Sequence, residues 1–375
     1  MKALSRLGLA TIATAAFVGI GVTAANATPA QHPAPPGGTV FVQTDGLSGN
    51  QIVSYDRLAG GTLRQAGIYD TGGNGVALNG SVVDHLASQS SLVRSGQSLF
   101  AVNGGSNSVT SFTVAGDKLI RRQVVDSDGQ APVSIAAYGH LVYVLNARGG
   151  GSIQGYLNLG DNLIAVPGWH RDLGLDPNAT PEFTSTPAQI AFTPDGSKLV
   201  ISTKGGTSAF DVFSLGLLGP SLQPVVSTFA GNVPFGFQFD ANGRLIASEA
   251  GPSAVASFTV NPDGTVTKDA ELATGQKATC WIVVDGERVY ASNAGSGTLS
   301  GYQIGQDGSL SSIGVTGTDA GTVDAAVSAD GHYLYVQTGA AGIVDEFEVG
   351  STGILQEIGS VTVPNGIGGE GIVAG

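Results

Sequence analysis

The chain has 375 residues, only 12% of them charged, and its 29 acidic side chains outnumber the 16 basic ones to give a formal net charge of −13. This balance argues against nucleic-acid binding, which needs clustered Lys and Arg, because Arg121-Arg122 is the one adjacent basic pair. The single cysteine, Cys280, excludes an internal disulfide, and the 58 glycines, about twice the usual share, favour a fold rich in tight turns.

Residues 1–27 have the features of a secretory signal peptide. Lys2 and Arg6 give a positive start, residues 7–22 are mostly apolar, and an Ala-Asn-Ala cleavage sequence ends at Ala27. The apolar run is short and interrupted by Gly and Thr, which favours a signal peptide over a membrane span. We therefore expect a secreted protein cleaved near Ala27, with a net charge of −15 because two cations are lost. Residues 28–38 are expected to form a disordered, Pro-rich lead.

From residue 39 onward the chain repeats one pattern seven times: an apolar strand that ends in a small polar residue, then a turn and two further strands. The strand-end position, with a basic period of about 44 residues and extra length in two units, holds Asp45, Asn103, Asn146, Thr203, Glu249, Asn293 and Thr338. Four strands of about 5 residues with short connections fill such a period. The repeat thus predicts an all-β fold, a single seven-bladed propeller domain of four-stranded blades over residues 39–375.

The two ends of the repeat predict how the ring closes. Every later unit has an inner strand before its strand-end position, whereas the first unit starts directly at Val40. Residues 371–374 resemble an inner strand with no partner after it. We expect this C-terminal strand to pair with residues 40–44 and to close the ring.

Two sets of positions are expected to lie on one face near the propeller axis: the residues that start the inner strands and those that follow the strand ends. From these sets we select Arg148, Lys204 and Glu249 as candidate catalytic residues, and Gln89, Gln189, Asn103, Asn146 and Asn293 as candidate ligand-binding residues. Two cations, a carboxylate and several amides suit a small carboxylate or sugar-acid ligand. A rim position in water is the alternative for Arg148 and Lys204, whereas Glu249 is expected to be partly buried with a partner such as Lys204.

Several blade sequences resemble one known family. LFAVNGGSNSVTSF, LVYVLNARGGGSI, QIAFTPDGSKLVIS and RVYASNAGSGTLSGY are similar to blades of the seven-bladed lactonase family, which includes bacterial 6-phosphogluconolactonases and fungal carboxymuconate cyclases. The resemblance covers residues 39–375 and implies the propeller fold and lactone hydrolysis. A fold does not by itself carry an activity.

The catalytic residues that this resemblance implies are replaced. The family pattern has a Pro-His and a Pro-Arg pair at inner-strand starts, a Glu after a strand end, and an Asn-Arg pair. The corresponding positions here are Pro132-Val133, Pro187-Ala188, Lys204 and Glu249-Ala250.

Other chemistry is less well supported by the sequence. Cys280 lacks a histidine in a matching position, so a packing role is favoured over a nucleophilic one. The five histidines show neither H-x-x-x-H nor H-x-H spacing, so we expect no metal and no cofactor. His85 is the one histidine expected to approach the axis. Two long inserts, residues 72–89 and 167–187, are expected on the same face, either as a partial lid or as rim decoration.

Three functions remain open at this point. The first is a secreted lactonase-like propeller, expected to be monomeric, that binds a small polar molecule in its central funnel. The second is an active lactone hydrolase with Glu249 or His85 as the base and Arg148 and Lys204 as electrostatic clamps. The third is a non-catalytic envelope or matrix propeller that binds protein or glycan.

Overall fold

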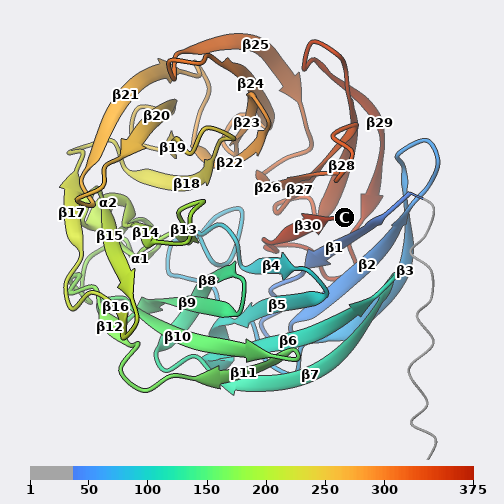
Figure 1. The fold of residues 1–375 in the computed structure, drawn as a ribbon. Coiled ribbons are helices and arrows are strands. Elements are labelled where there is room, and N and C mark those ends of the chain that lie inside the picture. The colour runs from blue at the N-terminus through green and yellow to red at the C-terminus, as the bar shows by residue number, and fades with distance from the viewer. Residues whose placement is uncertain (1–36) are drawn as a thin grey trace, which may run out of the picture. The chain divides into compact units, whose positions relative to one another are not determined.

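The computed structural model describes residues 37–375. The expected signal peptide, its cleavage site and most of the Pro-rich lead lie outside the described residues. Within them, seven antiparallel sheets stand around a central axis as the blades of a propeller, with the chain passing once around the ring (Figure 1). The predicted fold class, an all-β propeller of seven blades, is confirmed.

Each blade is numbered in chain order and its strands are given from the axis outward. Blade 1 consists of β30 (Ile372–Ala374), β1 (Thr39–Gln43), β2 (Gln51–Arg57) and β3 (Leu63–Asp70). Blade 2 consists of β4 (Leu92–Ser95), β5 (Ser98–Asn103), β6 (Ser108–Ala115) and β7 (Lys118–Asp126), with the short helix η1 (Gly104–Ser106) after β5. Blade 3 consists of β8 (Gln130–Tyr138), β9 (Leu141–Arg148), β10 (Ser152–Leu159) and β11 (Asn162–Ala165), with β12 (Arg171–Asp172) also paired to β10.

Blade 4 consists of β13 (Gln189–Phe192), β14 (Lys198–Ser202), β15 (Ala209–Gly216) and the outer pieces β16 (Gly219–Pro220) and β17 (Val225–Thr228), with α1 (Glu182–Ser185) before it and α2 (Lys204–Thr207) after β14. Blade 5 consists of β18 (Pro234–Phe239), β19 (Leu245–Glu249), β20 (Ala254–Val260) and β21 (Val266–Ala273). Blade 6 consists of β22 (Thr279–Asp285), β23 (Arg288–Asn293), β24 (Thr298–Ile304) and β25 (Leu310–Gly317). Blade 7 consists of β26 (Thr322–Val327), β27 (Tyr333–Thr338), β28 (Ile343–Val349) and β29 (Leu355–Thr362).

The ring closes as the two ends of the repeat predicted. In blade 1 the C-terminal strand β30 pairs antiparallel with β1, with Val40 opposite Ala374, Phe41 opposite Val373 and Val42 opposite Ile372. Figure 1 shows the red end of the chain beside the blue first strand. Strands from the two ends of the described chain therefore share one sheet.

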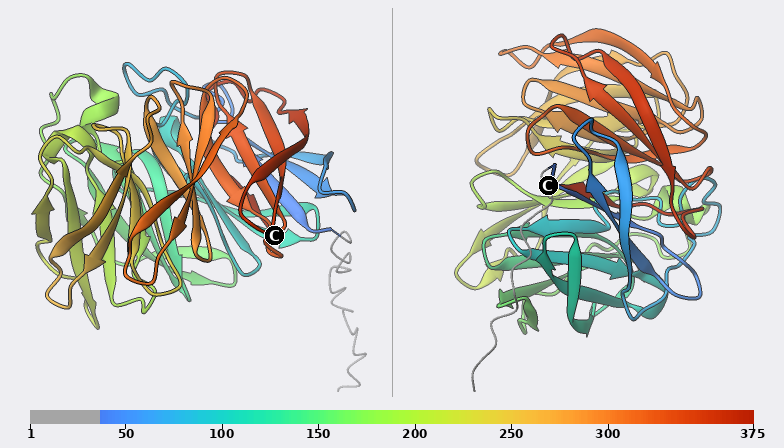
Figure 2. Two further views of the ribbon diagram at one scale, coloured as in Figure 1. Left: turned by 90° about the horizontal axis from the view of Figure 1, so that it is seen from above. Right: turned by 90° about the vertical axis from the view of Figure 1, so that its right-hand side faces the viewer.

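Burial is greatest in the second strand of each blade and lowest in the outermost strand, which explains the low content of charged residues. Every residue of the second strands β1 and β5 is buried, whereas the outermost strands β3 and β7 each have one buried residue and are otherwise half-buried or exposed. Inner and middle strands pack against neighbouring blades on both surfaces, so apolar side chains fill both faces there. Edge views of the ring show this stacking of sheets (Figure 2).

A recurrent irregularity bends the outer edge of the blades. In five blades the pairing of the third and fourth strands shifts register just before an aromatic residue, namely Tyr55, Phe112, Phe258, Tyr302 and Phe347. A β-bulge of this kind adds local twist and bends the strand. Each of these aromatic rings is buried, so the bulge and the ring recur together at the packing surface between blades.

Candidate functional site

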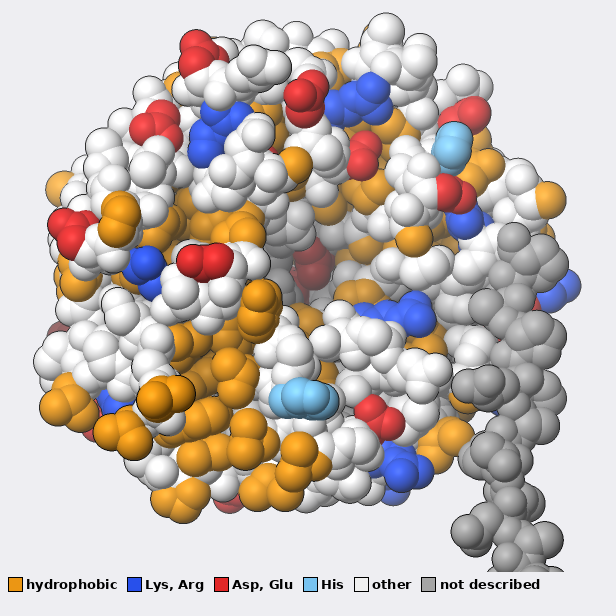
Figure 3. Space-filling model, in the orientation of Figure 1, with side chains coloured by type: hydrophobic (Ala, Val, Ile, Leu, Met, Phe, Trp, Pro, Cys, Tyr) orange, Lys and Arg blue, Asp and Glu red, His pale blue; other side chains and the backbone are white. Residues whose placement is uncertain are grey.

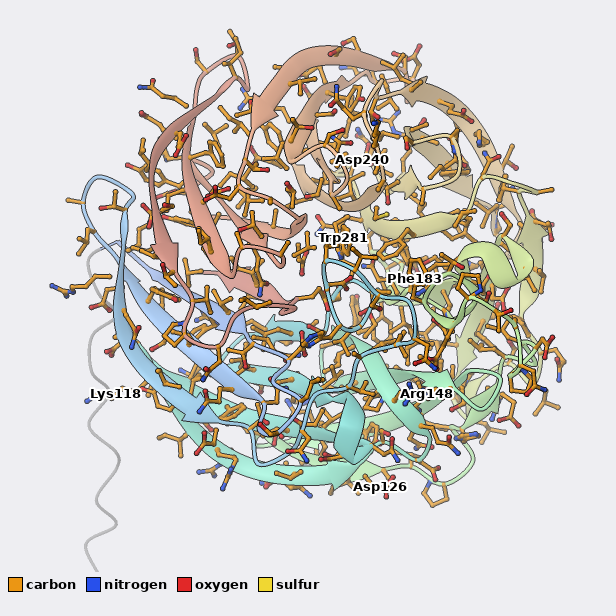
Figure 4. All side chains as sticks on the ribbon, turned by 180° about the vertical axis from the view of Figure 1, so that it is seen from behind. Lys118, Asp126, Arg148, Phe183, Asp240 and Trp281 are labelled. Carbon is orange, nitrogen blue, oxygen red and sulfur yellow. The ribbon has the colours of Figure 1, made fainter. Side chains whose placement is uncertain are left out.

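One face of the ring is closed by the chain itself. We call residues 76–91, which lie between β3 and β4, the axial segment, and the face where the innermost strands begin the start face. Figure 4 shows this loop across the centre of the start face, beside Trp281 and Phe183. Ser88 and Gln89 are buried at the axis. The first long insert therefore fills the start of the funnel and lies deeper than a partial lid at the surface.

Hydrogen bonds tie the axial segment to blades on several sides. The Trp281 indole N–H donates to Ser88 O over 2.5 Å, and the Ser88 hydroxyl donates to Val133 O over 2.9 Å. The Gln89 amide donates to Ile282 O over 2.7 Å and accepts from Ile282 N over 3.0 Å. Because blades 3 and 6 are not neighbours in the ring, the segment joins strands that the blades alone would leave apart.

The second insert lies on the rim of blades 3 and 4. Trp169 stacks on Tyr143 with ring centroids 5.8 Å apart, and Arg171 donates to the carbonyls of Pro220 and Ser221. Two hydrogen bonds reach the axial segment: Phe183 N donates to Asn79 O over 3.2 Å, and Asn79 N donates to Glu182 Oε2 over 2.7 Å. This insert thus supports the axial segment from one side.

The three candidate catalytic residues have separate partners. Arg148 forms a salt bridge with Glu182, with Nε 2.6 Å from Oε1, which raises the pKa of Arg148 and lowers that of Glu182. Lys204 is buried and donates from Nζ to Ala87 O over 2.6 Å, and burial lowers its pKa to about 7.

Glu249 is fully buried at the end of β19, and burial raises its pKa. Its carboxyl lies 2.8 Å from Lys268 Nζ and accepts from Asn232 Nδ2 over 2.7 Å. The expected partnership with Lys204 is wrong, because Lys268 on the outer strand β21 reaches inward to fill that role. Glu249 and Lys204 are therefore not brought together as an acid–base pair.

The candidate ligand-binding amides are used inside the protein. Gln189 bridges to the backbone of Phe237, donating to its oxygen over 2.9 Å and accepting from its nitrogen over 2.7 Å, as Gln89 does to Ile282. Each of the three asparagines is buried at its strand end and donates to hydroxyls of the next strand: Asn103 to Ser108 and Thr110, Asn146 to Ser152, and Asn293 to Thr298 and Ser300. These contacts hold neighbouring strands of one blade together.

The opposite face, where the innermost strands end, carries a central channel of about 360 Å³. Gln89, Ser90 and Asp324 lie at its deep end because they start or precede innermost strands, while Arg94 and Val327 stand near strand ends at its mouth. Figure 3 shows this hollow, with acidic atoms at its base and basic atoms beside its opening. The channel is the concave site at the axis that remains accessible.

The base of the channel adjoins a cluster of buried carboxyls. Burial raises the pKa of Asp324 to about 7, that of Asp84 to about 7 and that of Asp45 to about 8, and places the pKa of Glu370 well above its usual range. Lys204 is the cation whose field reaches Asp84. Strongly shifted carboxyls at the end of a cleft are typical of functional sites.

Sequence reasoning missed this cluster, although a signal existed. Asp324 and Glu370 occupy the inner-strand start of their units, where the other five units carry Gln89, Pro132, Gln189, Gly236 and Cys280. The inner-strand start is uncharged in five units and acidic in these two, and this difference was the signal in the sequence. Their proximity follows from ring closure, which sets the C-terminal strand next to β26.

The two other candidate groups, His85 and Cys280, lie among groups of the protein itself. His85 Nδ1 lies 3.0 Å from Asp45 O. Burial raises the pKa of the Cys280 thiol to about 12, so it is not a nucleophile near neutral pH.

Within residues 37–375, no group of three or more His, Cys, Asp and Glu side chains is arranged to hold a metal ion. No helix in that part of the chain is long and apolar enough to cross a membrane.

The fold defines the class of protein as a seven-bladed β-propeller. Neither the protein-family models nor the curated protein sequences gave a match. Solved structures do match: a presumed 6-phosphogluconolactonase of Bacteroides uniformis has 18% identity and a TM-score of 0.71, covering 90% of this chain and 99% of that one. A Lactobacillus plantarum protein has 19% identity and a TM-score of 0.71 over 90% and 99% of the two chains.

The periplasmic gluconolactonase PpgL of Pseudomonas aeruginosa is similar as well, with 16% identity and a TM-score of 0.67 over 90% of this chain and 98% of that one. At such low identities these likenesses show a shared fold. The resemblance drawn from the blade sequences is therefore confirmed at the level of the propeller.

Proposed function

We propose that the protein is a secreted lactonase-like propeller that binds a small sugar acid or lactone in its central channel. The observation that carries this proposal is the polarity of the channel, which has the Asp324 carboxyl at its deep end and the Arg94 guanidinium near its mouth. A ligand with hydroxyl groups at one end and a carboxylate at the other matches this arrangement. Secretion rests on the signal-peptide features of residues 1–27.

The walls of the channel suit a polar ligand of limited size. They are formed by the innermost strands, which have no further strand on their axial side and so direct backbone N–H and C=O groups toward the channel. Gln238 also lines the wall, and its Oε1 accepts from Val284 N over 2.8 Å, which fixes the side-chain amide in place. Fixed donors and acceptors of this kind recognise hydroxyl groups at little entropic cost.

The lactonase resemblance supports the ligand class but not the inherited catalytic site. The positions of the family's catalytic pattern hold Pro132-Val133, Pro187-Ala188, Lys204 and Glu249-Ala250, and the start face near them is closed by the axial segment. Any ligand at the axis would therefore enter from the opposite face. Names of the structural neighbours, gluconolactonase and 6-phosphogluconolactonase, make gluconate and its lactone the first compounds to try.

Isothermal titration calorimetry with gluconate and with neutral δ-gluconolactone tests the proposal. We expect Arg94→Gln to weaken gluconate binding about tenfold, the effect of losing one charge-assisted hydrogen bond, and to change lactone binding less than about twofold. Arg121→Gln, which removes a basic residue on β7 outside the channel, serves as the matched control and should change neither.

Equal effects of the Arg94 and Arg121 substitutions, or no binding of either compound, would contradict the proposal. Absence of small-molecule binding together with recovery of an envelope partner would favour the non-catalytic alternative.

Lactone hydrolysis is a second candidate function, favoured by the near-neutral pKa of about 7 at Asp324.

A further inference from the structure

Two carboxyl groups meet at the base of the channel. Asp324 lines the deep end, and the Glu370 carboxyl lies near enough to act on the pKa of Asp324, as Asp324 does on that of Glu370. Asp324 also accepts from the backbone of Ala325 over 3.0 Å and from that of Ile372. Glu370 is fully buried behind it. Asp324 is therefore the member of the pair that a molecule in the channel can touch.

Glu370 is held from behind by the axial segment. Its carboxyl lies 3.3 Å from the Ser88 hydroxyl oxygen, and its backbone oxygen accepts from the Ser91 hydroxyl over 2.8 Å. Its backbone N–H donates to Asp45 over 2.8 Å. The two backbone bonds hold the chain at Glu370 in place, and Ser88 contacts its carboxyl from the side of the axial segment.

Two buried carboxyl groups that repel each other are not easily ionised together, which favours one proton on the pair. The charged groups that face the pair are Asp45, Asp84 and, beyond Asp84, Lys204, with the Cys280 thiol beside Asp84 and Lys204. Asp45 and Asp84 each raise the pKa of Glu370, which favours retention of the shared proton. Carboxyl pairs that hold one proton divide the roles of acid and base between them.

We propose that Asp324 is the general base that opens a lactone ring bound in the channel, and that Glu370 is a positioning residue that keeps the proton of the pair. The inference rests on the proposed binding of lactones in the channel. None of Arg148, Lys204 and Glu249 takes part, because each is bonded to its own partner away from the channel.

The reaction balances without a cofactor. Asp324 removes a proton from water while the water oxygen forms a bond to the lactone carbonyl carbon, and the carbonyl electron pair moves to its oxygen. When the carbonyl re-forms, the ring C–O bond breaks and the departing oxygen takes the proton from Asp324. The product is the hydroxy acid, and the carboxyl pair returns to its starting state with its shared proton.

The first test measures hydrolysis of δ-gluconolactone by continuous titration of the acid released, corrected for the spontaneous reaction. Turnover by the wild-type protein should rise with pH around a midpoint near 7, where Asp324 becomes ionised. Asp324→Asn should lower kcat/KM at least about 100-fold while changing the lactone Kd less than about fivefold. Asp345→Asn, which neutralises a buried carboxyl on β28 outside the channel, is the matched control.

The second test separates positioning by Glu370 from a structural role. Glu370→Gln keeps a hydrogen-bond donor toward Asp324, so turnover at neutral pH should stay within about threefold. Turnover by the wild-type protein should decline again at alkaline pH when the shared proton is lost, and this decline should be absent in Glu370→Gln. Glu370→Leu removes the donor and should lower turnover at neutral pH more than about tenfold, with recovery at higher pH, because the pKa of Asp324 rises further.

The outcomes distinguish the two proposals. Lactone binding without turnover above the spontaneous rate, or turnover that survives Asp324→Asn, overturns the catalytic inference and leaves the binding proposal standing. Identical pH profiles for Glu370→Gln and the wild type overturn the role of Glu370. Absence of lactone binding while gluconate still binds overturns the catalytic inference alone, and absence of binding of both compounds overturns the proposed function itself.

Discussion

At the scale of single residues, Glu249 and Glu370 show how surroundings decide what a buried carboxyl does. Both are fully buried, but Lys268 lies 2.8 Å from Glu249, whereas Glu370 faces Asp324 and Asp45. Glu249 can remain ionised because it forms an ion pair with Lys268. Glu370, which lies beside other acids, shares a proton with Asp324 instead. Glu249 thus has a structural explanation that Glu370 lacks.

The ion pair of Glu249 leads to a stability prediction. Lys268→Met removes the cation and leaves a buried carboxylate, which should lower the free energy of unfolding by about 3 kcal/mol at pH 7.5. The folded-state pKa of Glu249 is raised by burial, so the folded protein binds the extra proton and stability falls as pH rises through that pKa. The variant should therefore recover part of its stability at pH 5.

Urea unfolding at the two pH values measures this difference. Glu271→Gln, which removes the other and more exposed partner of Lys268, is the control and should cost less than about 1 kcal/mol. A loss in Lys268→Met that is equal at both pH values would show that packing of Lys268 over Phe229 and Phe258, and not the charge of Glu249, accounts for the effect.

At the scale of elements, the axial segment is a connection that has become part of the core. Leu78 and Leu86 join the apolar cluster of blades 2 to 4, and Ser88 and Gln89 cross to Trp281 and Ile282 of blade 6. A segment bonded to non-neighbouring blades restrains their separation around the axis. It also supplies the base of the channel, so the segment links stability to the shape of the site.

We predict that Gln89→Leu destabilises the protein by about 2 to 4 kcal/mol, because the N–H and C=O groups of Ile282 lose their buried partner. Hydrogen exchange should accelerate in residues 78–91 and in β22 together. Gln303→Leu, on the more exposed part of β24, is the control and should have little effect. If Gln89 served only to bind ligand, its loss would leave both measurements unchanged.

At the scale of the whole molecule, ring closure depends on the short strand β30. Deletion of residues 372–375 removes β30, together with the channel-wall residues Ile372, Val373 and Ala374, and keeps Glu370. Loss of the buried Ile372 and of the pairing with β1 should lower Tm by about 5 °C or more. An unchanged Tm by calorimetry would mean that β30 does not hold the ring together.

The sequence predicted the architecture well because each blade is encoded locally. Strand alternation, turn residues and strand-end positions such as Asn103 and Asn293 recur within one unit, and those asparagines do hold neighbouring strands of their own blade. Ring closure was also predictable. The first unit lacks an inner strand, and the C-terminal residues form an inner strand with no unit after it, so the two complete one blade.

The site was less predictable because its contacts join distant parts of the chain. Nothing near residue 89 in sequence indicates that its amide binds the backbone of Ile282, and nothing near Glu249 indicates Lys268 on the fourth strand of the blade. The meeting of Asp324 and Glu370 likewise depends on the closed ring. Positions in a repeat therefore identified unusual residues, but only the packing of the blades decided which of them reach an accessible space.

The central claim is that a ligand occupies the channel that opens where the innermost strands end. A crystal structure of the protein grown with gluconate tests this claim most directly. The account predicts gluconate in the channel, with its hydroxyl groups toward Asp324 and its carboxylate toward Arg94. Gluconate bound on the start face or on the rim by Arg148, with the channel holding only water, would contradict it.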